Sequence, residues 1–408
     1  MSRKLIVLGA GMLLLAGCST LSSITGLLKS DKEKAVAPSK LTAIAEPIAV
    51  KRLWSVSIGQ GEGALAVRQK PAIENDTLFA ADSANQLVAI DRATGKIKWK
   101  ANPNKEAADG KGWKFWKKSA QPFALTGGPA VYSGLVALGG RNGEVFAFNA
   151  ADGSVLWKTM VSSSVISAPL VTFDTVVVRA NDGKVFGLDL STGEKRWQFD
   201  RGMPSLSVRG NSAPVLGPGI ILLGYEDGSL IALRQQDGQR VWEQLVAKPD
   251  GRNELERMAD IDGEIQVGDR EVFATSYRNS TMALSVGNGQ PIWVREVGGY
   301  AGIALLGDRV VVSDRDSNVW AFDRNSGSDL WKQSAMARRG LTTPVVQGAY
   351  IVTADAEGYV HWLDAATGDI KGRASAGKGV AGSPVVSDDG IVYVQSVDGK
   401  VTAFGLAQ

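Results

Sequence analysis

The sequence contains almost no cysteine or histidine: its 408 residues include one of each, Cys18 and His361. Metal sites built from several Cys or His ligands are therefore excluded, and a chain with one cysteine cannot form an internal disulfide. His361 lies in the stretch YVHWLD, and no Gly-x-Ser-x-Gly elbow supports a nucleophilic triad around it. We expect this histidine to fill an inter-blade or channel position of the repeat fold predicted below, and stability to come from packing.

The sequence also lacks an excess of either charge. It has 45 Lys and Arg against 42 Asp and Glu, a formal net charge of +3, and no long basic run. A general nucleic-acid-binding surface is therefore not indicated. Proline is scarce at 14 residues, glycine is abundant at 48, and 44% of residues are hydrophobic. This composition is typical of a globular protein with many short turns.

An apolar run at residues 5–17, LIVLGAGMLLLAG, has the length of a signal peptide and is too short to span a membrane as a stable helix. The sequence Leu-Ala-Gly-Cys at its end is similar to the lipobox of bacterial lipoproteins, in which the cysteine is acylated after cleavage. The resemblance implies that residues 1–17 are removed, that Cys18 carries lipid, and that Ser19 favours sorting to the outer membrane. A plain secretory signal is the alternative. The Ser- and Lys-rich residues 18–48 then form a flexible tether.

A repeating unit of four β-type runs covers the rest of the chain. A turn rich in Asp, Ser, Thr and Gly joins the third run of each unit to a fourth run, which usually carries Trp. The third runs begin near Leu87, Val145, Val185, Leu230, Thr281, Val319, Val360 and Val401. The fourth runs carry Trp99, Trp157, Trp197, Trp242, Trp293 and Trp331, with Gly372 at the seventh position. The mean spacing of these tryptophans, roughly 45 residues, suits a four-stranded propeller blade.

The last repeat ends after its third run, GKVTAFGLAQ (399–408), whereas KRLWSVSIG (51–59) is a fourth run with no third run before it. A propeller must close, and pairing the first strand with the last hides a sheet edge. We therefore predict an all-β fold for residues 49–408: an eight-bladed β-propeller with four-stranded antiparallel blades, the last one closed by the strand around Trp54. Seven blades is the alternative. Each repeat tryptophan is expected to pack between blades rather than to stack on a ligand.

The repeat Ala-x-Asp-x-x-Thr-Gly-x-x-x-x-Trp resembles that of quinoprotein alcohol dehydrogenases, eight-bladed propellers that bind pyrroloquinoline quinone and calcium. Those enzymes commonly carry an adjacent Cys-Cys pair over the cofactor and are considerably longer, whereas this chain has only Cys18. A calcium site needs about six to eight oxygen ligands, and the Asp and Asn residues here lie mostly in repeat turns. We therefore expect no enzymatic activity, no cofactor and no metal.

Three segments interrupt the repeat, and such insertions map to loops that carry binding. Residues 103–122 combine five lysines with three aromatic residues; they could touch a membrane or an unfolded client, although a solvated loop is the simpler interpretation. Residues 201–214 contain Leu206 and Val208 on one side of an extended stretch, followed by Arg209, a pattern typical of an interface or of a loop sealed onto its own blade.

The third segment, residues 250–264, is rich in charge, and Asp260 and Asp262 alternate onto one side of it. Two carboxylates are few for a calcium site, so we expect them to pair with an arginine, either Arg209, Arg257 or one from a partner. The second and third segments enter consecutive blades at the same height. They are therefore expected to form one surface.

Lipobox, tether, eight repeats, PSLSVRG and DID together resemble the BamB family, the propeller lipoproteins of the β-barrel assembly machinery in Gram-negative outer membranes. The resemblance covers essentially the whole chain. It implies a non-enzymatic, lipid-anchored scaffold that faces the periplasm, binds the periplasmic polypeptide-transport-associated domains of BamA, and assists folding and insertion of outer-membrane proteins. The family's Leu-x-Leu-Arg motif falls on Leu206, Val208 and Arg209, with valine replacing the second leucine, and its Asp-x-Asp motif falls on Asp260 and Asp262.

Two other functions stay open at this point. The first is a periplasmic, chaperone-like propeller that holds unfolded outer-membrane clients by β-augmentation at exposed strand edges. The second, which the sequence disfavours, is a quinoprotein dehydrogenase. A scaffold is distinguished from a client-binding protein by one stable partner in place of many weak ones.

Overall fold

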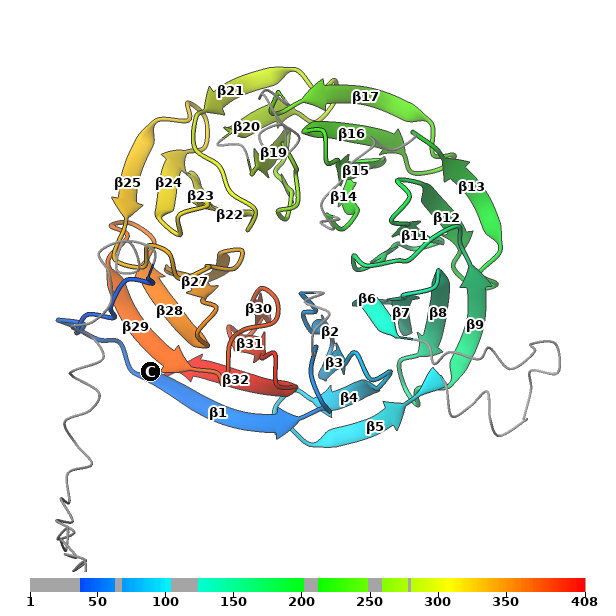
Figure 1. The fold of residues 1–408 in the computed structure, drawn as a ribbon, viewed down its shortest axis with the longest axis horizontal. Helices are drawn as coiled ribbons and strands as arrows, with labels where there is room; N and C mark the ends of the chain where they lie inside the picture. Colours follow the sequence, from blue (N-terminus) through cyan, green and yellow to red (C-terminus); the bar gives the residue numbers. More distant parts are fainter. Residues whose placement is uncertain are drawn as a thin grey trace, which may run out of the picture. The chain divides into compact units, whose positions relative to one another are not determined.

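The computed structural model describes residues 37–62, 68–103, 124–201, 212–248, 259–277 and 280–407. Its compact unit, Ser39–Gln408, consists of eight four-stranded sheets that follow one another around a ring (Figure 1). This architecture confirms the predicted eight-bladed propeller. The described residues include no helix that is long and apolar enough to cross a membrane.

Each blade contributes one strand at each of four levels from the centre outwards. The innermost strands are β2 (Ala72–Glu74), β6 (Leu125–Tyr132), β10 (Leu170–Val171), β14 (Val215–Gly217), β18 (Gln266–Val267), β22 (Ile303–Leu306), β26 (Val345–Gln347) and β30 (Val385–Val386). The second level consists of β3 (Thr77–Ala81), β7 (Leu135–Gly140), β11 (Thr175–Arg179), β15 (Ile220–Gly224), β19 (Glu271–Ser276), β23 (Arg309–Ser313), β27 (Tyr350–Ala354) and β31 (Val392–Gln395).

The two outer levels contain the third and fourth runs of the repeat. The third level consists of β4 (Leu87–Asp91), β8 (Glu144–Asn149), β12 (Val185–Asp189), β16 (Ser229–Arg234), β20 (Ser280–Ser285), β24 (Val319–Asp323), β28 (Tyr359–Asp364) and β32 (Lys400–Leu406). The outermost strands are β5 (Ile97–Ala101), β9 (Val155–Met160), β13 (Lys195–Phe199), β17 (Arg240–Leu245), β21 (Pro291–Arg295), β25 (Asp329–Gln333), β29 (Ile370–Ser375) and β1 (Val50–Ser57). We number the blades 1 to 7 from β2–β5 to β26–β29.

Blade 8 combines both ends of the ring. Its order is β1-β32-β31-β30, and β1 runs antiparallel to β32 from the pair Val50 and Leu406 to the pair Ser57 and Lys400. The C-terminal strand thus gains its outer neighbour from the N-terminal side of the chain, as Figure 1 shows where the blue and red strands meet. This pairing confirms the predicted closure.

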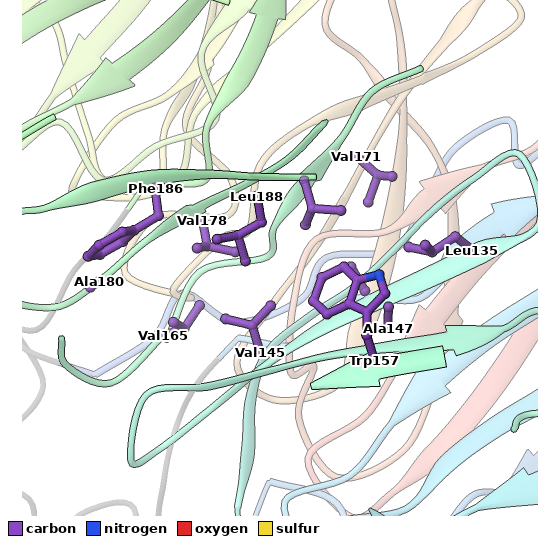
Figure 2. Packing of buried hydrophobic residues seen from close by; sticks show 12 residues of the cluster. Leu135, Val145, Ala147, Trp157, Val165, Val171, Val178, Ala180, Phe186 and Leu188 are labelled. Atoms are coloured by element: carbon purple, nitrogen blue, oxygen red, sulfur yellow. The ribbon is translucent and has the colours of Figure 1, made fainter. Parts of the chain in front are cut away.

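The burial of each strand follows its level in the blade. All five residues of β15 are buried, because the second strand is covered on both faces by neighbouring blades, whereas β17 at the rim is mostly exposed and buries only Trp242. The hydrophobic core therefore lies between blades. Figure 2 shows one such layer, in which Val145 and Trp157 of blade 2 meet Val178 and Leu188 of blade 3.

Each repeat tryptophan packs against a turn of the next blade. The indole Nε1 of Trp157 donates to the carbonyl oxygen of Leu190 at 2.8 Å. Its ring lies against Gly193, where an added Cβ would be 2.5 Å from Cε3, so only glycine allows this approach. The same contact with a turn glycine is made by the pairs Trp54 and Gly95, Trp99 and Gly153, Trp197 and Gly238, Trp242 and Gly289, Trp293 and Gly327, and Trp331 and Gly368. The prediction that these tryptophans pack between blades is confirmed.

The exception at Gly372 follows from the closure of the ring. Blade 7 faces blade 8, whose third and fourth strands are not joined by a turn because one is C-terminal and the other N-terminal. No turn glycine is available there for a tryptophan. The lead-in to β1 fills the place instead: a Cβ at Gly372 would lie 3.0 Å from both Ile48 Cγ1 and Val50 Cγ2.

Because strands alternate in direction, each blade-to-blade connector emerges at the same end of the ring as the turn between second and third strands. We call this end the connector face. The described ends of all three interrupting segments belong to connectors, so these ends lie on it.

Candidate partner-binding site

The predicted site residues divide between described and undescribed parts of the chain. Asp260 and Asp262 lie in the connector from β17 to β18, which enters blade 5. Leu206, Val208 and Arg209 belong to the connector that enters blade 4, in a stretch outside the described residues, as does Arg257. Cys18 and nearly all of the loop 103–122 also lie outside the described residues. The assignments of these residues stay predictions.

The described ends of the two connectors meet at one turn of blade 4. Ser212, where the first connector resumes, accepts a hydrogen bond at its Oγ from the Gly224 amide at 3.1 Å. In the second connector, the Ile261 amide donates to the Tyr225 carbonyl oxygen at 3.2 Å. Gly224 also lies so close to Ile261 that a Cβ there would be 2.5 Å from Cγ2. This shared attachment supports the expectation that the two segments form one surface.

The carboxylates of Asp260 and Asp262 are held in a position that disfavours their charge. Asp260 is 3% exposed, and burial, together with the nearby carboxylates of Asp262 and Glu226, raises its pKa to about 7. Burial also raises the pKa of Asp262 to about 6, although Arg68 opposes this shift. Among the described residues, neither carboxylate forms an ion pair or a side-chain hydrogen bond. A cation placed here would be attracted by two carboxylates whose negative charges are poorly compensated.

A buried ion pair supports this site from below. Arg179 Nη2 lies 2.7 Å from Glu226 Oε1, and both side chains are almost completely buried. The guanidinium of Arg179 also lies over the Tyr225 ring, 4.4 Å from its centroid. Burial raises the pKa of Tyr225 to about 12, so the phenol is neutral under ordinary conditions. The two aspartates therefore lie near a buried, charge-paired group of side chains.

A second arginine holds the start of the connector that carries the Leu-x-Val-Arg stretch. The guanidinium of Arg201 lies 4.9 Å from the centroid of the Tyr225 ring. It pairs with Asp227 at 2.9 Å and also with Glu243. Arg201 directly precedes residues 202–211, so the connector leaves blade 3 from a point that ion pairs with blade 4 hold in place.

Sequence reasoning missed a set of contacts that reach the same connector from the far side of the ring. Lys70, which precedes β2 in blade 1, pairs with Glu264 at 2.8 Å. The guanidinium of Arg68 lies 5.2 Å from the centroid of the Tyr300 ring. The signal in the sequence was the pair of cations in RQK, but nothing in the local pattern indicates which blade they reach. These contacts connect blade 1 with the connectors of blades 5 and 6.

The described residues include no group of three or more His, Cys, Asp and Glu side chains placed to hold a metal ion. Asp260 and Asp262, two carboxylates with little charge compensation near the buried pair of Arg179 and Glu226, are therefore the described part of a candidate docking surface.

Comparison with known proteins identifies the family of the chain. A family model described as outer membrane protein assembly factor BamB matches residues 41–110, 106–333 and 315–407. The outer membrane protein assembly factor BamB of Xanthomonas campestris is 40% identical over 394 residues, covering 97% of this chain and 95% of the relative. That of Escherichia coli is 31% identical, covering 98% of each chain.

Solved structures give the same fold. The crystal structure of BamB from Moraxella catarrhalis superposes with a TM-score of 0.77 at 29% identity, covering 88% of this chain and 100% of that one. The quinohemoprotein alcohol dehydrogenase of Comamonas testosteroni has a TM-score of 0.67 at 15% identity, a likeness of fold alone. The chain belongs to the family of outer membrane protein assembly factor BamB.

Proposed function

We propose that this chain is a non-enzymatic scaffold subunit of the β-barrel assembly machinery, which binds the periplasmic domains of BamA and assists the folding and insertion of outer-membrane proteins. The relatives are named as assembly factors. The observation that carries the docking surface is the buried position of Asp260, whose pKa is raised to about 7 beside Asp262 and Glu226. A partner that inserts an arginine or lysine there relieves this cost, while Leu206, Val208 and Arg209 supply apolar and cationic contacts.

The test is purification in mild detergent from native membranes, with the associated proteins identified by mass spectrometry. Wild type is compared with Arg209→Glu and with Asp260→Asn. The matched control is Arg270→Glu, since Arg270 is an exposed arginine in the turn between β18 and β19, on the face opposite the connectors. We expect one stoichiometric barrel-forming partner in wild type and control, and its loss in the two site variants. Retention in Arg209→Glu and Asp260→Asn contradicts the site.

The proposed location is the periplasmic side of the outer membrane, where lipid on Cys18 holds the protein. One acyl chain gives only weak membrane attachment, so stable anchoring needs several chains, as lipoproteins of this type carry. Cys18→Ala is expected to move the protein from the membrane to the soluble fraction after cell lysis. Membrane attachment that survives this substitution would place the anchor elsewhere.

One observation favours the client-binding function as a second candidate. The residue before the repeat tryptophan is an exposed aliphatic side chain on several outermost strands: Leu53, Leu156, Val241, Ile292 and Leu330. An extended client strand with alternating apolar side chains could pair with such a strand and cover them. Crosslinking from position 292 distinguishes the two functions. Many weakly captured outer-membrane proteins support client binding, and a single partner supports the scaffold.

A further inference from the structure

The lead-in to β1 is attached to blade 7. We call residues 39–48 the clip. Four hydrogen bonds join its backbone to the blade and to the connector that enters it: Ser39 amide to Ala337 carbonyl at 3.0 Å, Arg339 Nη1 to Ser39 carbonyl at 2.8 Å, Arg373 Nη1 to Thr42 carbonyl at 2.9 Å, and Ile48 amide to Lys371 carbonyl at 2.7 Å. Two of the four donors are arginine side chains, so the hold on the clip depends on where those guanidinium groups point.

A buried polar network positions both arginines. Arg339 Nε donates to Asp355 Oδ2 at 2.7 Å, and His361 Nε2 lies 2.8 Å from the same oxygen. On the other side of the imidazole, Arg373 Nε donates to His361 Nδ1 at 3.3 Å. Asp355 and His361 are completely buried, and Arg339 is 3% exposed. The single histidine of the chain therefore stands between the two arginines that hold the clip.

This geometry defines the protonation state of the ring. An arginine can only donate, so Nδ1 must accept, and the one ring proton is on Nε2, from which it is donated to Asp355. Three more charged or titratable groups surround the ring: Arg339 from the connector entering blade 7, Arg373 from β29, and Tyr359 with its ring centroid at 6.5 Å. Glu357 is one step further away, paired with Arg339.

The surroundings oppose a positive charge on the imidazole. Burial lowers the pKa of His361, and Arg373 and Arg339 lower it further, against the attraction of Asp355. Asp355 itself stays ionised: burial alone would raise its pKa, but the hydrogen bonds from His361, the Tyr359 amide and Arg339 outweigh this and hold it below the usual range.

We propose that His361 is a proton-sensitive lock on the clip: the neutral ring holds residues 39–48 against blade 7, and protonation releases them. A proton taken from water onto Nδ1 turns the acceptor of Arg373 Nε into a donor and brings a positive imidazole against a guanidinium. Arg373 must turn away, and the Thr42 carbonyl loses its donor. Release frees a segment of ten residues, which spans about 36 Å at most when fully extended.

The sign follows from the direction of the shift. A histidine whose pKa is lowered in the clipped state binds a proton more readily once the clip is open. The clip is therefore fully attached at pH values above the unperturbed histidine pKa of about 6.5. The attachment is lost as the pH falls from there towards the lowered pKa of His361.

The test uses the full chain without a polyhistidine tag, so that His361 is the only imidazole in the nuclear magnetic resonance spectrum. The ring is titrated from about pH 7.5 to about pH 4.5, and hydrogen exchange of peptides covering residues 39–48 is followed by mass spectrometry over the same range. We expect the protection factor of the clip, the intrinsic exchange rate at each pH divided by the observed rate, to fall about tenfold or more, with the same midpoint as the imidazole titration. Peptides covering β21, a distant outermost strand, should stay protected.

The matched variant is His361→Gln, because its amide donates to Asp355 and accepts from Arg373 as the neutral ring does, but does not titrate. It should keep the clip protected at both ends of the pH range, whereas Arg373→Gln should expose the clip at both. Wild-type protection that is unchanged in acid overturns the lock. Acid release of the clip in His361→Gln also overturns the lock, because the titrating group would then be Glu46 or Glu357. A ring that does not titrate before the whole chain unfolds also overturns it.

Discussion

Lys70 Nζ lies 2.8 Å from Glu264 Oε2, although the two residues enter blades 1 and 5, which stand four blades apart in the ring. In Figure 1 these blades lie on opposite sides of the centre. The ion pair therefore crosses the middle of the propeller on its connector face. It fastens the connector that carries Asp260 and Asp262 to the far side of the ring.

Removing this pair should have a small, salt-dependent effect. The side chains are 38% and 33% exposed, so solvent screens their attraction. Lys70→Ala is expected to lower the free energy of unfolding by less than about 1 kcal/mol, and to raise the pKa of Glu264, which Lys70 holds below its usual range against the effect of burial. Urea denaturation at low and high salt measures the effect, with Lys400→Ala as control for a local pair. A loss that salt does not reduce would contradict this account.

Asp260→Asn should stabilise the free protein while weakening its proposed complex. The raised pKa of Asp260 means that its protonated form is favoured in the fold. The stability that the protonated carboxyl contributes is fully present below its unfolded-state pKa of about 3.9. It is lost as the pH rises through its folded-state pKa of about 7. The variant should therefore gain about 0.5–2 kcal/mol near pH 8 and little near pH 4.

Thermal denaturation across this pH range measures the gain. Asp269→Asn, at a side chain 96% exposed, is the control and should show no such trend. Equal stability of Asp260→Asn and wild type at high pH would show that the buried carboxylate costs nothing. Partner binding should show the opposite pH dependence, being strongest above pH 7, where both aspartates are charged.

Arg179→Met should be among the most damaging single changes in the fold. It removes the cation from a pair in which Arg179 and Glu226 are both almost fully buried. Breaking such a pair costs about 3–5 kcal/mol, because a buried charge loses its counter-ion. Arg196→Met is the control, since Arg196 is 39% exposed and pairs with Asp174 and Asp189 at the surface. Similar denaturation midpoints for the two variants would contradict the structural role of the buried pair.

Because the repeat tryptophans pack between blades, Trp293→Ala should lower the stability of the protein strongly. Its ring lies against Gly327, and Nε1 donates to the Arg324 carbonyl oxygen at 2.8 Å. Truncation leaves a cavity between blades 5 and 6, and should lower the free energy of unfolding by about 3–5 kcal/mol. Val294→Ala on the same strand, at a side chain 50% exposed, is the control and should cost little.

Gly372→Trp should destabilise the protein, although it restores the repeat consensus. Ile48 and Val50 already occupy the space, each with a carbon 3.0 Å from the position of an added Cβ. Overpacking of this kind costs about 1–3 kcal/mol. The result is measured by chemical denaturation beside Gly372→Ala. Greater stability of Gly372→Trp would mean that Ile48 and Val50 move aside easily for a larger side chain.

Local patterns in the sequence specify the parts of the fold that recur. The alternation of β-type runs, the turn glycines and the spacing of the tryptophans specify a four-stranded blade, because these signals are local to each repeat. The surplus third run at residues 399–408 and the surplus fourth run at Trp54 specified eight blades and their closure, since an unpaired edge would otherwise be left exposed.

Contacts between residues of distant repeats are visible only in the folded ring. The sequence predicts a tether as far as residue 48, whereas the compact unit begins at Ser39, whose carbonyl accepts a hydrogen bond from Arg339. Nothing local to Gly372 shows that Ile48 takes the place of a tryptophan, and nothing local to Lys70 shows that it reaches Glu264. Such contacts depend on closing a ring of eight blades, which brings together residues that hundreds of positions of chain separate.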